Sequence, residues 1–168
     1  MITIKVEGTK EIDAFLRKAK KAQDQLEDLS KPLTKIKEQQ TSRWAKNFTS
    51  EGGVYDRWAP LADWTLEERD SMGFGSGPIL VRNGTLLAHF VEQNEAGEVT
   101  NDAINWEMSN KGGSRGYAAA TVSHHSGYDT ALGTHVPARK LWDLDEKDVQ
   151  NAEKILEKYV DSIIKRYF

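Results

Sequence analysis

The chain has 168 residues, of which 38% are hydrophobic and 29% are charged, and it contains no cysteine. This length suits a single domain with its own core, and the absence of cysteine excludes disulfides and thiolate metal sites. Residues 1–50 carry 11 Lys+Arg against 7 Asp+Glu, and the remainder carries 12 against 19, so the two parts have net charges of +4 and −7. Neither has the dense positive charge of a nucleic-acid-binding face, and we expect no nucleic-acid partner.

The first fifty residues predict a short strand followed by a long, broken helix. Ile2–Val6 alternates apolar and polar residues, which is typical of a strand. From Ile12 the apolar residues recur at steps of three and four, as on an amphipathic helix that packs on its own core or contacts another subunit. Pro32 should break this helix, and Ser30 is a candidate cap for its second half. The apolar positions are Ile12, Phe15, Ala19, Ala22, Leu26, Leu29, Leu33 and Ile36.

The middle of the chain predicts a small, mostly antiparallel sheet with long loops. Residues 49–85 are rich in glycine and proline, with one helical turn that Asp63 could cap. Residues 85–91 form an apolar run of uncertain type. Ile104, Trp106 and Met108 alternate with polar residues, as in a half-buried strand. We expect further exposed loops at 111–116, 117–126 and 128–134.

The last element is a helix with a clear start signal. Asp145 can cap it with Asp148 three residues later. We therefore expect one α+β domain over residues 1–168, divided into a helical arm at 1–50, a loop-rich sheet region at 51–142 and a C-terminal helix at 143–168. No apolar segment is long enough to span a bilayer, and the first residues lack a leader's apolar core, so we expect no membrane association and residence in the cytosol. The apolar face predicted for the C-terminal helix consists of Val149, Ala152, Leu156, Tyr159, Ile163 and Tyr167.

Catalytic signals are weak, and we expect no enzyme activity, no cofactor and no metal. A metal-dependent hydrolase would have to use His124, His125 and Asp129. Adjacent histidines point in different directions on a helix or strand and make poor joint ligands. The glycine-rich run at 73–77 lacks the strand and helix that flank a phosphate-binding loop or nucleophile elbow.

Tryptophan is frequent, and we expect two environments for it. Trp44 and Trp106 lie in helical and strand patterns and suit a core. Trp58 and Trp64 lie in or beside a charged, glycine-rich loop, where an exposed indole would anchor a partner protein. The acidic residues around them argue against stacking on single-stranded nucleic acid.

The order of several motifs resembles the phage virion morphogenesis family over about residues 48–168. The strongest pieces are Arg57-Trp58-Ala59-Pro60-Leu61 and Pro137-Ala138-Arg139. The chain departs from the family at His124-His125-Ser126-Gly127 and at Lys140-Leu141-Trp142-Asp143. The other matching pieces are Phe48-Thr49-Ser50-Glu51-Gly52-Gly53, Thr65, Ile79-Leu80, Gly84-Thr85-Leu86, Tyr117-Ala118, His124, Gly127 and Val136.

The resemblance implies a structural protein that completes the tail and joins it to the capsid at its head-proximal end. A tail terminator, a connector or a minor tail protein is the alternative. The implied partners are other tail and connector proteins in the virion, with a homo-oligomeric ring, guessed to be a hexamer, as the working form. The segment 57–61 either docks onto a partner or pins its loop to the core. The expected partner-binding residues are Arg57, Trp58, Leu61, Trp64, His124, Arg139 and Trp142.

Overall fold

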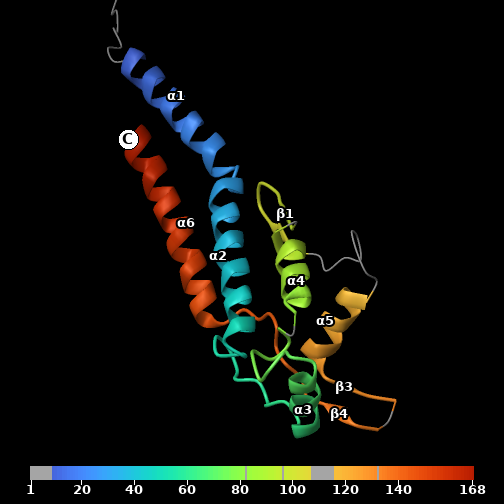
Figure 1. Cartoon of the computed structure of the whole chain (residues 1–168). Coiled ribbons are helices and arrows are strands. Elements are labelled where there is room, and N and C mark those ends of the chain that lie inside the picture. Colours follow the sequence, from blue (N-terminus) through green and yellow to red (C-terminus); the bar gives the residue numbers. More distant parts are fainter. Residues whose placement is uncertain (1–8, 82, 96, 107–115, 132) are drawn as a thin grey trace, which may run out of the picture.

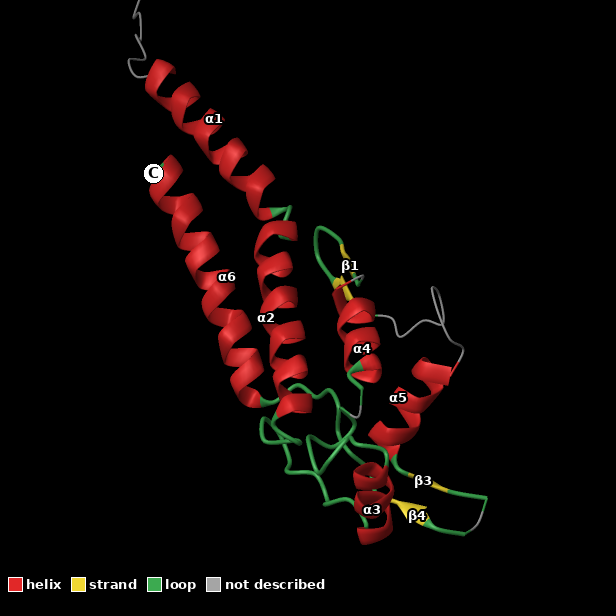
Figure 2. Cartoon of the chain, viewed as in Figure 1, coloured by secondary structure: helices red, strands yellow, loops and turns green. Residues whose placement is uncertain are grey.

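The computed structural model describes residues 9–81, 83–95, 97–106, 116–131 and 133–168, and the fold is α+β, as predicted. An elongated arm consists of α1 and α2, which follow one another end to end, and α6, which lies alongside both; the shorter elements lie beside α2 and below its end (Figure 1). Figure 2 shows how little of the described chain is strand. The elements are α1 Thr9–Leu26, α2 Ser30–Thr49, α3 Asp63–Ser71, α4 Thr85–Glu95, β1 Glu98–Val99, β2 Ile104–Asn105, α5 Gly116–Ser126, β3 Tyr128–Asp129, β4 His135–Val136 and α6 Glu146–Tyr167.

The predicted break in the long helix separates α1 from α2. Pro32 lies in the first turn of α2, where a missing amide hydrogen removes no helical hydrogen bond. The prediction that Ser30 caps this helix is wrong, because Leu29 takes the cap position without a side-chain hydrogen bond. Instead, the Asp28 carboxylate accepts a hydrogen bond from the Ser30 amide at 3.0 Å. The strand predicted at 2–6 lies outside the described residues.

Helix α6 lies along α1 and α2 (Figures 1 and 2) and is fixed at two places. At its start the predicted capping box is confirmed, since Asp145 and Asp148 each accept the other's backbone amide hydrogen. Arg43 of α2 pairs with both carboxylates, and its Nε lies 2.9 Å from Asp148. Further along, the Tyr159 hydroxyl lies 3.0 Å from the carbonyl oxygen of Gln25, near the α1–α2 break. No described helix is long and apolar enough to cross a membrane.

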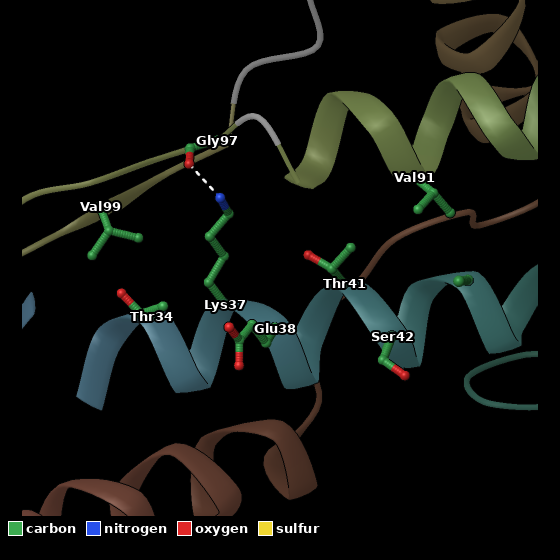
Figure 3. Close-up of a pocket in the computed structure, with 9 residues that line it drawn as sticks. Thr34, Lys37, Glu38, Thr41, Ser42, Val91, Gly97 and Val99 are labelled. Atoms are coloured by element: carbon green, nitrogen blue, oxygen red, sulfur yellow. Dashed lines mark hydrogen bonds between the residues drawn. The ribbon is translucent and has the colours of Figure 1, made fainter. Parts of the chain in front are cut away.

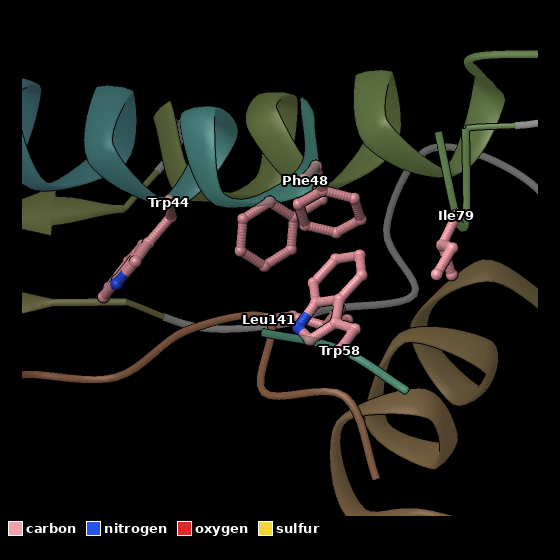
Figure 4. Packing of buried hydrophobic residues seen from close by; sticks show 6 residues of the cluster. Trp44, Phe48, Trp58, Ile79 and Leu141 are labelled. Atoms are coloured by element: carbon pink, nitrogen blue, oxygen red, sulfur yellow. The ribbon is translucent and has the colours of Figure 1, made fainter. Parts of the chain in front are cut away.

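The hydrophobic core joins α2 and α4 to three loop segments, which contribute Trp58, Ile79 and Leu141 (Figure 4). Phe48 is fully buried and packs against Phe90, with ring centroids 4.9 Å apart. Three α2 and loop side chains also donate hydrogen bonds to the backbone of residues 140–143, including Trp44 to the Asp143 carbonyl at 2.9 Å. This returning segment is therefore held by both burial and hydrogen bonds. The core residues are Trp44, Phe48, Trp58, Ile79, Phe90 and Leu141.

Several loop and strand predictions need correction. The apolar run at 85–91 belongs to helix α4, and residues 117–126, expected as a loop, belong to helix α5. The loop expected at 128–134 begins with β3, which pairs antiparallel with β4; β1 and β2 form a second, separate antiparallel pair. Asp63 is not a cap but the first residue of α3, after Ala62. Met108 and residues 111–115 lie outside the described part of the chain.

Candidate functional site

Two of the cavities that open on the described surface have volumes above 500 Å³. The first, of about 690 Å³, lies between α2, α4 and β1 (Figure 3). Lys37 reaches across it and donates a hydrogen bond to the Gly97 carbonyl, which bridges α2 and the β1 segment. None of the residues expected to bind partners lines this cavity, and its lysine is already used to hold the structure together.

The second cavity, of about 520 Å³, brings together four of the seven residues expected to bind partners. We name it the Arg139 cavity. Leu61 comes from the loop before α3, and Trp64 comes from α3 itself. His124 lies near the end of α5, and Arg139 follows β4. The remaining lining residues are Pro60, Ala62, Thr65, Glu68, Arg69, Leu80, Tyr128, Thr134, His135, Val136 and Pro137.

Of the two roles left open for the segment 57–61, Trp58 takes the one within the core of the chain. It is only 6% exposed, and its ring packs against Phe48 with centroids 5.8 Å apart. Its indole nitrogen donates to the Lys140 carbonyl at 3.1 Å. Gly52 makes this approach possible, because a Cβ there would lie 2.4 Å from the Trp58 ring. Trp58 therefore pins the 57–61 loop to the core, whereas Leu61, three residues later, borders the cavity.

Trp142 and Arg57 also lie outside the Arg139 cavity. Trp142 is half-buried and stacks on His125, with ring centroids 3.9 Å apart. Arg57 is exposed on the loop. The seven expected residues thus divide into four at one cavity, two packed with the core, and one exposed on a loop.

Arg139 is the most unusual group in the cavity. It is only 4% exposed, and among the described residues its guanidinium has no acidic side chain within 4 Å. Its Nε has no hydrogen-bond partner there, and its Nη1 lies at 3.5 Å from the Pro137 carbonyl, the limit of a hydrogen bond. Burial lowers the pKa of Arg139, and nearby Tyr128 opposes that change. Its backbone amide donates to the His124 carbonyl at 2.7 Å, which fixes the residue against α5.

Arg69 provides a contrast within the same cavity. It is equally buried, at 5% exposed. Its guanidinium donates to the carbonyls of Gly75 at 3.2 Å and Gly77 at 2.8 Å. Arg69 therefore organises the loop after α3, whereas the charge of Arg139 remains uncompensated within the described structure.

The two adjacent histidines face different neighbours, as predicted. His124 makes an edge contact with Tyr128, and burial followed by the charge of Arg139 lowers its pKa. His125 stacks on Trp142, and its Nδ1 accepts the Leu141 amide hydrogen at 3.1 Å. Among the described residues, no three histidine, aspartate or glutamate side chains lie close enough to hold a metal ion.

A second feature lies on the arm rather than in a cavity. Phe15 and Leu16 of α1 are 56% and 57% exposed, although Phe15 belongs to the predicted apolar face and Leu16 is also apolar. Phe15 contacts Phe168, at the end of α6, with ring centroids 5.6 Å apart, and Phe168 is itself 63% exposed. We call this the arm surface. Its large exposed apolar residues are Ile12, Phe15, Leu16, Leu26, Ile164 and Phe168.

Sequence reasoning missed Arg69 and Tyr128 as cavity residues. No local pattern marks them, because the cavity forms only where α3 meets the α5 end and the β3–β4 pair. Comparisons with models of known protein families, with curated proteins and with solved structures found no match.

Proposed function

We propose that this chain is a non-enzymatic assembly protein of a tailed bacteriophage that joins tail to capsid by docking onto other virion proteins. The observation that carries the docking role is the arm surface. Large exposed apolar surfaces mark contact sites in soluble proteins, and the contact between Phe15 and Phe168 brings exposed apolar residues of α1 and of the α6 end together. The phage assignment rests on the ordered motifs from Phe48 to Arg139.

The arm surface has enough apolar area to contribute to a stable contact. Burying a large apolar side chain fully contributes about 1.5–3 kcal/mol. The six residues of the arm surface are each 40–63% exposed, so complete coverage would gain on the order of 5 kcal/mol before the entropic loss of association. Only part of the amphipathic α1 face is covered within the chain, by α6, where Ala22 is 6% exposed.

The proposed setting is the head-proximal end of the tail, with connector and tail proteins as partners. A sixfold ring of copies would match the cyclic symmetry of a tail. The opposite net charges of residues 1–50 and 51–168 favour heterologous contacts between neighbouring copies in such a ring.

Electron microscopy of particles assembled without the protein tests this proposal. We expect filled capsids and complete tails that remain separate, and joined particles after wild-type protein is supplied. Phe15→Glu should fail to restore joining, because it places a carboxylate in the arm surface. Ala14→Glu adds the same group to an exposed neighbouring position off the apolar face of α1, and it should restore joining. Circular dichroism checks that both variants fold.

Other outcomes of that experiment distinguish the alternatives. Tails of irregular length would indicate a terminator, and capsids that lose their DNA would indicate a connector. Normal infectious particles in the absence of the protein would contradict any role in joining. Equal rescue by both variants would show that the arm surface is not the docking surface.

A further inference from the structure

The Arg139 cavity holds a buried cation that is poorly compensated in the described structure. A guanidinium removed from water normally has a carboxylate partner or a full set of hydrogen bonds, because an unpaired buried charge is strongly unfavourable. Arg139 has neither among the described residues, and its Nε is orphaned. Such an arrangement is expected where the partner of the charge belongs to a ligand.

The other charged groups around the cavity do not provide a partner for the charge of Arg139. Arg69 is held by the carbonyls of Gly75 and Gly77. The exposed His135 ring lies 2.8 Å from the Asp129 carboxylate, so this acid is turned toward its own hairpin. Glu68 borders the cavity but is exposed and lies beyond ion-pair distance of Arg139.

Part of the cavity wall consists of apolar side chains from several segments of the fold. Leu61 and Leu80 are half-buried, and Val136 and Pro137 form the side next to Arg139. A volume of about 520 Å³ is within the usual range for sites that enclose a ligand group. The cavity thus combines one buried cation that lacks a partner among the described residues, Arg139, with apolar side chains on its wall, which suits a carboxylate attached to an apolar group.

Exposed aromatic residues at the cavity extend this surface beyond the size of a small acid. Trp64 on α3 is 62% exposed, and Tyr128 on β3 is 37% exposed. Tryptophan and tyrosine around a buried arginine are the residue types that dominate protein interfaces. A peptide segment would cover both rings, whereas a small carboxylic acid would leave them in water.

We propose that the Arg139 cavity binds an acidic segment of another protein, with an aspartate or glutamate carboxylate on the Arg139 guanidinium and an adjacent apolar side chain against the cavity wall. This goes beyond the assembly role, because it uses a surface other than the arm and requires no phage partner. Charge-assisted hydrogen bonds to a guanidinium are worth about 1.5–3 kcal/mol, so the carboxylate should increase affinity roughly tenfold or more over an uncharged amide.

Nuclear magnetic resonance on the full chain tests the proposal directly. The probes are the blocked tripeptide acetyl-Phe-Glu-Leu-amide and its glutamine counterpart, each titrated to about 10 mM, where even millimolar affinity is detected. The reporters are the Nε–H signal of Arg139 and the indole N–H signal of Trp64, assigned by triple-resonance spectra of the wild-type chain. We expect the acidic peptide to shift both signals and the glutamine peptide to bind at least tenfold more weakly.

Matched variants test whether the preference for the acidic peptide depends on Arg139. Arg139→Met should abolish the preference for the acidic peptide, whereas Arg57→Met removes an exposed arginine outside the cavity and should leave it intact. The comparison of the two peptides on the wild-type chain needs no variant, so it holds even if Arg139→Met fails to fold. Equal binding of the two peptides, or no shift of the Arg139 signal, would overturn the proposal.

Two further results would also overturn the proposal, because each would identify another occupant of the Arg139 cavity. Sodium acetate that shifts both reporters as strongly as the peptide would identify a site for small carboxylates alone. Shifts of the same signals with protein concentration, in the absence of peptide, would identify a second copy of this chain.

Discussion

Replacing Arg139 with methionine should stabilise the isolated protein, although the residue is almost fully buried. Methionine keeps an unbranched stem of similar length and removes the charge. An unsatisfied buried N–H group costs about 1–3 kcal/mol, and Arg139 Nε is such a group. Because the rest of the guanidinium borders an open cavity, we take the lower part of this range and expect a gain of about 1 kcal/mol in the free energy of unfolding. For a 168-residue chain, this raises Tm by about 2–4 °C.

Arg69→Met is the matched control, with the opposite expected sign. Arg69 has the same burial, but its guanidinium donates two hydrogen bonds to the loop after α3. Their loss should lower the free energy of unfolding by about 2 kcal/mol. Urea unfolding followed by circular dichroism and calorimetry measures both variants. If Arg139→Met is destabilised as much as Arg69→Met, Arg139 is a structural residue and the reasoning from its missing partner is wrong.

Two other predictions concern His125 and Gly127. Burial lowers the pKa of His125 below its ordinary value of 6.5, so the unfolded chain binds the proton more tightly, and the free energy of unfolding should fall as the pH drops below about 6.5. In His125→Gln, urea unfolding between pH 8 and pH 5 should show a weaker pH dependence, and an unchanged slope would contradict this assignment. Gly127→Ala should destabilise the chain by about 2 kcal/mol or more, because φ is +75° and the new Cβ would lie 2.8 Å from the Ala138 nitrogen. Gly133→Ala, with the same φ and no described atom within 4 Å of its Cβ, should cost only about 1 kcal/mol, and equal losses would show that the clash is relieved.

The helices of the arm were predictable because their signals are local. The three- and four-residue spacing of α1, the proline in the first turn of α2 and the Asp145–Asp148 box each act within a few residues. The helix at 116–126 gave no comparable signal. Its small residues and paired histidines lack an amphipathic pattern, and its end is positioned by the backbone hydrogen bond from Arg139 to His124.

The position of Trp58 shows why the burial of a loop residue cannot be predicted from the adjacent sequence alone. Its surroundings in sequence are charged and rich in glycine, which favours exposure. In the structure, Phe48 and the Lys140 carbonyl, ten residues before it and eighty-two after it, provide its packing surface and its hydrogen bond. Gly52 lets the indole come close to the backbone.

The sequence by itself determined the arm helices, the break at Pro32, the start of α6 and the residue types available for docking. Only the tertiary structure decided that Leu61, Trp64, His124 and Arg139 share one cavity, and that the Arg139 charge there is left without a partner in the described chain. The physical reason is that periodicity and capping depend on neighbouring residues. The desolvation of a charge depends on segments that meet only after the chain has folded.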